Sequence, residues 1–175
     1  ALRLWAEQEL AALARQLEIP TRAKARAQRA QEGLERLWRP ELGRFVYHDC
    51  RRQQDIDADV IGAYIPALFE QRGQRAEDCL SQFRERYGGM VLFPSTAPTS
   101  PSFDPLCYWR GPSWVNIAWL FAQRAEFREQ VVSQLPKIIE SCGFREYYHP
   151  ETGKGLGAER FSWTAALALD LLHED

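Results

Sequence analysis

The sequence has 175 residues, of which 45% are hydrophobic and 26% are charged, and its formal net charge is -2 at pH 7. Such a composition is typical of a soluble globular chain, and the small negative charge argues against nucleic acid or an anionic membrane surface as a main partner. No apolar run approaches the roughly 20 residues that span a bilayer, so we also expect no membrane contact.

The cysteines are spaced too irregularly for a zinc site. Cys50, Cys79, Cys107 and Cys142 form no Cys-x-x-Cys pair, and only three histidines accompany them. We therefore predict neither a metal nor a cofactor. Their mostly apolar neighbours favour reduced, buried thiols in a cytoplasmic protein, and a disulfide between two of them is the alternative. The chain begins at Ala1 without an initiating Met, which suggests a processed chain or a piece of a longer one.

The first half of the chain has the periodicity of helices. Helices are predicted over residues 2–18, 21–38, 57–72 and 74–86. Leu10, Leu13 and Leu17 form the apolar stripe of the first, and Thr21 is a suitable N-cap for the second. Pro66 predicts a kink or a late start in the third. Between the second and third, residues 44–49 alternate enough to form a short extended segment.

The second half combines helices with two long loops. Helices are predicted over residues 113–124, 126–142 and 161–173, with a kink at Pro136. The last is Ala and Leu on nearly all sides, which indicates burial. Residues 90–108 and 144–160 are predicted to be irregular, and loops of that length are often functional. About seven helices and almost no sheet favour a toroid of helical hairpins, in which long loops gather at one end.

The stretch from Tyr108 to Trp119 concentrates aromatic side chains around an arginine. Indole faces cover the apolar C–H patches of a sugar ring, and a guanidinium donates to hydroxyls or to a carboxylate. Gly111-Pro112 predicts a turn, with Pro112 at the first position of the helix that follows. The stretch is therefore a candidate sugar site, and the alternative is a buried aromatic cluster that locks the start of a helix.

The second loop adds carboxylates. Cleavage of a glycosidic bond needs one carboxylic acid to protonate the leaving oxygen and a second carboxylate as base or nucleophile. The candidates are Glu146, Glu159, Glu151 and Asp104, and the flanking aromatic residues favour the first two over a solvated surface role. We interpret His48 and His149 as structural.

Two motifs are distinctive. The first is Tyr108-Trp109-Arg110-Gly111-Pro112-x-Trp114-x-Asn116. The second is Glu146-Tyr147-Tyr148-x-Pro150-x-Thr152-Gly153, followed by Gly157 and Phe161-x-Trp163-Thr164. Together they resemble glycoside hydrolase family 63, close to its bacterial mannosylglycerate and glucosylglycerate hydrolase branch. Trehalases of family 37 share a related pattern. The resemblance spans essentially the whole chain.

The resemblance implies an all-α (α/α)6 toroid and inverting hydrolysis of an α-glycosidic bond in a small sugar or sugar-glycerate substrate. Glu146 matches the general base of the family. The residues that would bind the sugar are Tyr108, Trp109, Arg110, Gly111, Trp114, Asn116, Glu159 and Trp163.

One part of the family pattern is missing. The general acid of the family is an Asp in a Glu-Ser-Gly-x-Asp-x-Ser segment, which does not occur here, and seven helices are fewer than a full toroid contains. Residues 1–175 are therefore expected to form the C-terminal half of one catalytic domain, which alone would be a very poor catalyst. Half a toroid would also expose apolar helix faces and favour self-association.

Two other functions stay open. A sugar epimerase or isomerase on the same toroid would use His48 or His149 as a catalytic group. A helical carbohydrate-binding domain without catalysis would fit the missing acid. The sequence does not choose between glucosyl, mannosyl and trehalose-like substrates.

Overall fold

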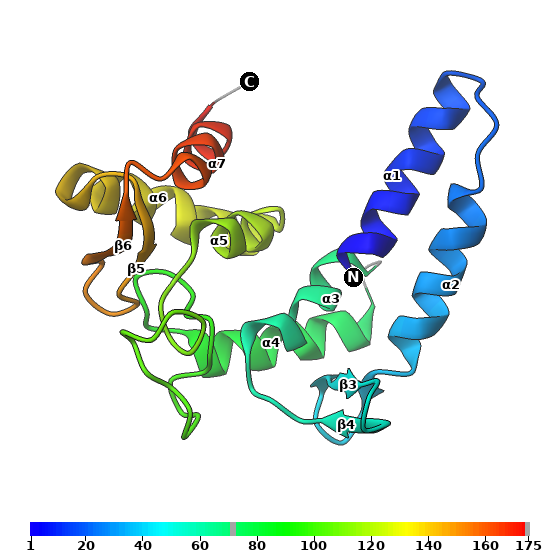
Figure 1. Cartoon of the computed structure of the whole chain (residues 1–175), viewed down its shortest axis with the longest axis horizontal. Helices are drawn as coiled ribbons and strands as arrows, with labels where there is room; N and C mark the ends of the chain where they lie inside the picture. The colour runs from blue at the N-terminus through cyan, green and yellow to red at the C-terminus, as the bar shows by residue number, and fades with distance from the viewer. Residues whose placement is uncertain (71–72, 174–175) are drawn as a thin grey trace. The chain divides into compact units, whose positions relative to one another are not determined.

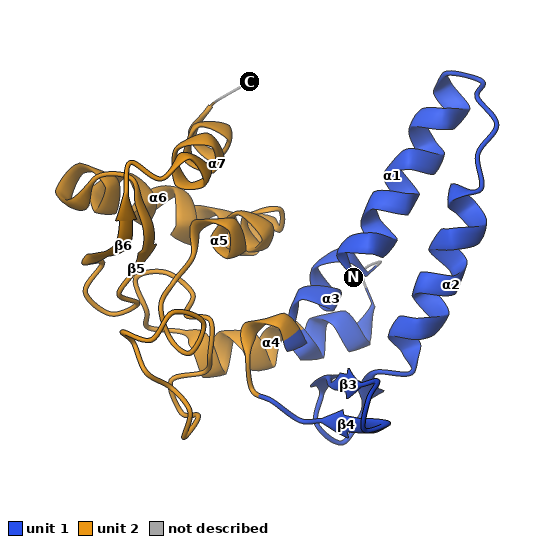
Figure 2. Ribbon diagram, viewed as in Figure 1, with its two compact units in different colours: residues 1–58, 63–79 blue, residues 59–62, 80–175 orange. Residues whose placement is uncertain are grey.

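The computed structural model describes residues 1–70 and 73–173, and it divides into two compact units (Figure 1, Figure 2). Unit 1 comprises Ala1–Ala58 and Ala63–Cys79, and unit 2 comprises Asp59–Gly62 and Leu80–Asp175. Within the described residues, none of the helices combines the length and the apolar character that crossing a membrane requires.

Unit 1 begins with two helices that lie side by side, α1 (Leu2–Gln16) and α2 (Ala23–Glu35) (Figure 1). Small and apolar side chains pack between them, and Arg26 donates from Nε to Glu7 Oε1 at 2.6 Å. The N-cap of α2 is Arg22 and not Thr21 as predicted, because the helix begins one residue later, although Thr21 Oγ1 still accepts a hydrogen bond from the N–H of Ala23 at 3.1 Å. The predicted apolar stripe of α1 is exposed, however, with Leu10, Leu13 and Leu17 at 44%, 51% and 58% exposure.

Two small antiparallel sheets follow in unit 1. Strand β1 (Trp38–Arg39) pairs with β2 (Arg44–Phe45), and β3 (Tyr47–Asp49) pairs with β4 (Gln54–Ile56). The extended segment predicted over residues 44–49 is confirmed, because it contains β2 and β3. The two hairpins to which these strands belong were not predicted.

The helix predicted over residues 57–72 is much shorter in the structure. A 3-10 turn, η1 (Ile61–Ala63), precedes α3 (Ile65–Phe69), and residues 71–72 lie outside the described part. Pro66 occupies the first turn of α3, where its missing N–H leaves no hydrogen bond unmade. The late start that Pro66 predicted is confirmed. Helix α4 (Gln74–Tyr87) begins in unit 1 and ends in unit 2.

Phenylalanine side chains build the core of unit 2 between α4, α5 (Val115–Ala122) and α6 (Ala125–Cys142). Phe83 stacks on Phe121 at 4.2 Å between ring centroids and meets Phe127 edge-on at 5.4 Å. All three are at least 98% buried.

Helix α6 contains Pro136 and ends at Gly143, whose φ of 73° suits a glycine after a helix.

Helix α5 starts two residues later than predicted. Pro112 does not occupy its first position, because Ser113 is extended and pairs with Pro94 and Tyr148, and Trp114 is the N-cap. The preceding loop is irregular as predicted. It is nevertheless fixed to unit 2 by backbone hydrogen bonds, for example from the N–H of Ile61 to the carbonyl of Ser95 at 3.1 Å.

The segment predicted as a second loop contains a hairpin. Strand β5 (Arg145–Tyr148) pairs antiparallel with β6 (Gly155–Glu159). With three two-stranded sheets in the described residues, the prediction of an all-α chain is too strong, and the chain is mainly helical instead. Strand β6 was not predicted. Its sequence contains two glycines, so it has neither alternating apolar and polar residues nor many residues that favour strands.

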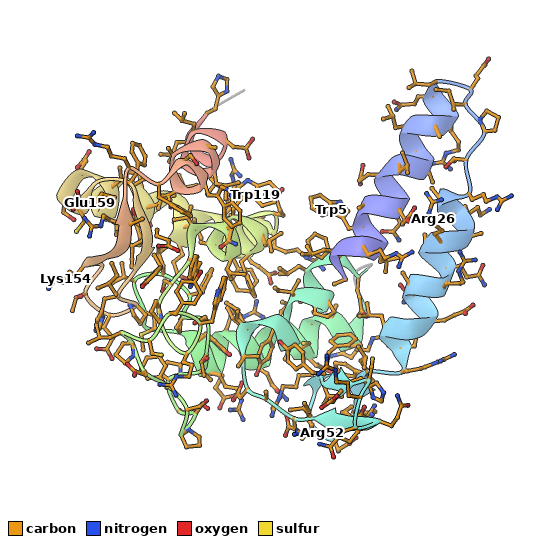
Figure 3. All side chains as sticks on the ribbon, in the orientation of Figure 1. Trp5, Arg26, Arg52, Trp119, Lys154 and Glu159 are labelled. Carbon is orange, nitrogen blue, oxygen red and sulfur yellow. The ribbon has the colours of Figure 1, made fainter. Side chains whose placement is uncertain are left out.

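Helix α7 (Ser162–Leu172) was predicted to be buried on all sides, which is wrong for this structure. Only Thr164, Ala168 and Leu171 are buried, whereas Leu169 is 69% exposed. The indole Nε1 of Trp119 on α5, a residue labelled in Figure 3, donates to Asp170 Oδ2 on α7 at 2.6 Å.

The cysteines are free thiols in the structure, so the disulfide alternative is not realised. Only Cys79 fulfils the prediction of a buried thiol, and burial raises its pKa to about 12. Cys50 is exposed, because it lies in the turn between β3 and β4.

Candidate functional site

The two segments that carry the motifs meet in unit 2 through a backbone pair. The N–H of Ser113 donates to the carbonyl of Tyr148 at 2.8 Å, and the N–H of Tyr148 donates to the carbonyl of Ser113 at 2.9 Å. Both residues are completely buried, and the Ser113 hydroxyl donates to the carbonyl of Leu92 at 2.9 Å. The start of α5 and strand β5 are thus fixed side by side.

Four rings form one aromatic cluster across this junction: Tyr108, Trp109, Trp114 and Tyr147. Trp109 and Trp114 stack with an interplanar angle of 1° and a centroid distance of 4.1 Å. Tyr147 lies 4.9 Å from Trp114 and 5.6 Å from Tyr108, measured between ring centroids. Trp114 is 3% exposed, whereas Trp109 and Tyr108 are 42% and 50% exposed. The buried Trp114 fits the interpretation of the stretch as a buried aromatic cluster, whereas the exposed rings of Trp109 and Tyr108 do not.

Tyr108 adopts a backbone conformation that is unusual for a residue with a side chain. Its φ is 33°, in the region where the Cβ atom crowds the backbone. The indole N–H of Trp114 donates to the carbonyl of Tyr108 at 3.2 Å, and the two rings meet edge-on. The buried tryptophan thus holds the strained residue in place.

Arg110 lies at the exposed end of the same loop. Its Nε–H donates to Cys107 Sγ at 3.2 Å, which raises the pKa of Arg110, and its Nη2 is 3.5 Å from Asp104 Oδ2. The loose contact with Asp104 and the exposure of the guanidinium leave N–H groups free to bind a ligand.

Gly111 and Asn116 occupy supporting positions. A Cβ atom on Gly111 would lie 2.2 Å from the carbonyl oxygen of Asp104, so the loop closes only with glycine there. Asn116 is half-buried in the first turn of α5, and its Oδ1 accepts a hydrogen bond from the N–H of Ile117 at 2.9 Å.

Glu146 lies next to the aromatic cluster on β5. Its Oε2 accepts a hydrogen bond from the N–H of Ala158 at 3.1 Å, and its Oε1 accepts none from the described residues. Burial, together with the nearby charge of Glu146, raises the pKa of the Tyr147 phenol. The carboxylate therefore has one oxygen held by the backbone and one available, beside a ring of the cluster.

Glu159 and Trp163 have contact partners outside the four rings of the aromatic cluster. Glu159, which is labelled in Figure 3, forms an ion pair with Arg145 across the hairpin. The two members of this ion pair border an open pocket of about 400 Å³ that also involves Cys142 and Arg160. Trp163, in the first turn of α7, is 59% exposed and meets Phe161 edge-on at 5.9 Å. The described residues contain no group of three or more His, Cys, Asp and Glu side chains that could hold a metal ion.

Sequence reasoning missed three parts of this arrangement. Tyr147 was not among the predicted sugar-binding residues, although it joins the two motifs. Arg145 was not predicted as a site residue either, and Gly157 was recognised only as part of the second motif and not for its place beside Glu146. The spacing Gly153-x-Gly155-x-Gly157 was the available signal, because glycine at alternate positions of a strand often marks a close backbone approach.

A model of the mannosylglycerate hydrolase MGH1-like glycoside hydrolase domain matches residues 1–164 of this chain. The chain belongs to this family. The resemblance drawn from the two motifs is thereby confirmed.

Curated relatives carry related names. A mannosylglycerate hydrolase of Thermus thermophilus is 38% identical over 149 residues, which cover 81% of this chain and 36% of the relative. A mannosylglycerate hydrolase of Rubrobacter radiotolerans is 33% identical, with 97% of this chain and 41% of the relative covered. A glucosylglycerate hydrolase of Mycolicibacterium hassiacum is 42% identical over 97 residues, which cover 50% of this chain and 20% of the relative.

Solved structures of the same family are similar in fold. The family 63 mannosylglycerate hydrolase from Thermus thermophilus in complex with glucose has a TM-score of 0.85 and 33% identity, covering 97% of this chain and 45% of that structure. The complex of a mannosylglycerate hydrolase from the same organism with Tris and D-glycerate has a TM-score of 0.84 and 36% identity, covering 95% and 42%. This chain spans about two fifths of the length of the proteins that it matches.

Proposed function

We propose that this chain provides the general base and one side of the sugar subsite for inverting hydrolysis of an α-glycosidic bond. Its substrate would be a small glucoside or mannoside linked to glycerate. The chain would form about the C-terminal half of a single (α/α)6 catalytic domain. The observation that supports the proposal is the Ser113–Tyr148 backbone pair, because it joins an exposed aromatic surface to a half-buried carboxylate.

The aromatic cluster is suited to binding the sugar ring. Trp114 covers one face of Trp109, and the exposure of Trp109 leaves its other face for the C–H patches of a pyranose. The phenols of Tyr108 and Tyr147 can bond to hydroxyls at the edge of the ring. Gly111 shapes this loop, and Asn116, Glu159 and Trp163 would complete the subsite from its margin.

Arg110 is the group best suited to the glycerate part of the substrate. A planar guanidinium binds a carboxylate through two parallel hydrogen bonds, and the contact of Arg110 with Asp104 is long enough to yield to such a ligand. The names of the relatives, mannosylglycerate hydrolase and glucosylglycerate hydrolase, support a sugar-glycerate as the substrate class that we propose.

The chemistry assigned to Glu146 is removal of a proton from water. In an inverting reaction the activated water attacks the anomeric carbon from the face opposite the leaving group, while a second carboxylic acid protonates the leaving oxygen. Oε1 of Glu146 is the oxygen available for the water. Because the acid motif does not occur in this sequence, we expect the chain alone to hydrolyse glycerate glycosides very slowly.

A carbohydrate-binding domain without catalysis is the second candidate. The absence of the acid motif favours it, and it would use the same aromatic cluster. A sugar epimerase has less support, because both candidate histidines have local partners. His48 Nδ1 is 2.9 Å from Asp55 Oδ1, and His149 Nδ1 accepts a hydrogen bond from the N–H of Glu151 at 3.3 Å.

Calorimetric titration of the chain with mannose, glucose and D-glycerate tests the sugar subsite. Trp109→Ala should weaken sugar binding by about tenfold or more, which corresponds to about 1.4 kcal/mol. Leu106→Ala is the matched control, because it removes an exposed apolar side chain from the same loop outside the aromatic cluster. Equal sugar affinity in the wild-type chain and the Trp109 variant would contradict the proposal.

A further inference from the structure

The β5–β6 hairpin is irregular opposite Glu146. Tyr147 pairs with Leu156 and Arg145 pairs with Glu159, so Gly157 and Ala158 together face the single residue Glu146. Two residues opposite one form a β-bulge, and a glycine with positive φ in the first position is the mark of the G1 type. Gly157 has a φ of 68°. Bulges of this kind change the direction of a side chain, and here that side chain is Glu146.

The bulge brings the backbone of β6 closer to Glu146 than any residue with a side chain would allow. A Cβ atom on Gly157 would lie 2.6 Å from Tyr147 Cε1, 2.7 Å from Glu146 Oε2 and 2.8 Å from Glu146 Cβ. Both the space and the backbone conformation therefore require glycine. The close approach is what allows the N–H of Ala158 to reach Oε2.

One peptide group connects Glu146 with Arg145. The carbonyl of Gly157 accepts a hydrogen bond from Arg145 Nη2 at 3.3 Å, and the N–H of the same peptide group, which belongs to Ala158, donates to Glu146 Oε2 at 3.1 Å. A trans peptide is planar, and its C=O and N–H point in opposite directions. Arg145 and Glu146 thus hold the two ends of a single dipole.

Arg145 is itself fixed at several points. Its guanidinium forms an ion pair with Glu159, and its aliphatic stem crosses β6 where a Cβ atom on Gly155 would lie 2.4 Å from Arg145 Cγ. Its carbonyl accepts a hydrogen bond from the buried Thr164 hydroxyl at 2.7 Å. The side chain therefore has little freedom to release the Gly157–Ala158 peptide.

We propose that Arg145 is a positioning residue for Glu146 and that it acts through the Gly157–Ala158 peptide group. The peptide occupies Oε2 and leaves Oε1 of Glu146 to face the attacking water. The catalytic consequence rests on the proposed function of Glu146 as the base, whereas the positioning itself is a property of the folded hairpin.

Nuclear magnetic resonance tests the positioning without any catalytic activity. In the wild-type chain the Ala158 amide proton should move downfield as the Glu146 carboxyl carbon titrates, because an ionised carboxylate is the stronger acceptor. Glu146→Gln should abolish this movement. Arg145→Ala should abolish it while the carboxyl carbon still titrates, and Arg145→Lys should restore part of it.

Lys154→Ala is the matched control, because it removes an exposed cation from the same hairpin that does not contact the Gly157–Ala158 peptide (Figure 3). It should keep the full movement of the Ala158 resonance. A movement of wild-type size in Arg145→Ala would overturn the positioning role.

Hydrolysis of an α-mannosyl or α-glucosyl fluoride, which needs no acid, measures the catalytic consequence. Arg145→Ala should lower kcat by roughly tenfold to a hundredfold with KM unchanged, as expected for a misplaced catalytic group. An unchanged kcat would overturn the catalytic role of the positioning. No hydrolysis by the wild-type chain would instead contradict the proposed function, while the resonance experiment still decides the role of Arg145.

Discussion

Tyr108 combines an exposed ring with a backbone conformation that costs free energy. A positive φ of 33° is tolerated here because the indole N–H of Trp114 fixes the carbonyl and three rings border the side chain. Strain of this kind persists only where the surroundings hold it, and it is concentrated at functional sites. In the aromatic cluster it directs the Tyr108 ring toward Tyr147.

Replacing Tyr108 separates the backbone cost from the loss of the ring. Tyr108→Gly and Tyr108→Ala remove the same ring, but only glycine accepts positive φ without strain. We predict that the glycine variant has the larger free energy of unfolding, by about 1 kcal/mol, as measured by urea denaturation. At an ordinary position alanine is the more stable of the two, so a more stable alanine variant would show that the conformation is not strained.

At the scale of single elements, a helix can be predicted from the sequence where its apolar side chains repeat with the helical period. The helices now called α1, α2, α4 and α6 were predicted within a few residues, because their apolar side chains repeat with the helical period. The late start of α3 followed from Pro66 alone. The irregular loop over residues 90–108 was predicted from its prolines and small polar residues.

The parts that were not predicted depend on tertiary contacts. The start of α5 is delayed because Ser113 pairs with Tyr148, a residue far along the chain. The hairpin of β5 and β6 is held by backbone pairing and by the Arg145–Glu159 ion pair rather than by alternating apolar residues. The aromatic residues and Glu146 were recognised as candidate site residues, but the close approach of Gly157 is visible only in the folded chain.

At the scale of the whole molecule, apolar side chains remain exposed in each unit. Leu10, Leu13 and Leu17 on α1 belong to unit 1, and in unit 2 an apolar groove of about 220 Å³ runs along α6 and α7 past Ile139 and Leu169. Exposed apolar patches promote association because burying them removes apolar surface from water. The matched proteins are also more than twice as long as this chain, because the chain covers only 36% of one relative and 42% of one solved structure.

We predict that the isolated chain self-associates through such surfaces. Leu13→Glu should increase the monomer fraction in sedimentation velocity experiments, because it places a charge in the exposed leucine stripe. Gln16→Glu adds the same charge at another exposed position of α1 and should change the monomer fraction much less. A monomeric wild-type chain at all accessible concentrations would contradict this prediction.

The role proposed for Glu146 is that of the base in an inverting glycosidase site, and the sequence of this chain contains no motif for the acid. An α-glycosyl fluoride tests it directly, because fluoride leaves without protonation and needs only the base. The chain should hydrolyse α-mannosyl or α-glucosyl fluoride and release the β-anomer, as followed by nuclear magnetic resonance. Mannosylglycerate and glucosylglycerate should react far more slowly, and Glu146→Gln should lower the fluoride rate by about a hundredfold or more. Glycerate glycosides hydrolysed as fast as the fluorides, or a Glu146→Gln variant with undiminished fluoride hydrolysis, would contradict the account.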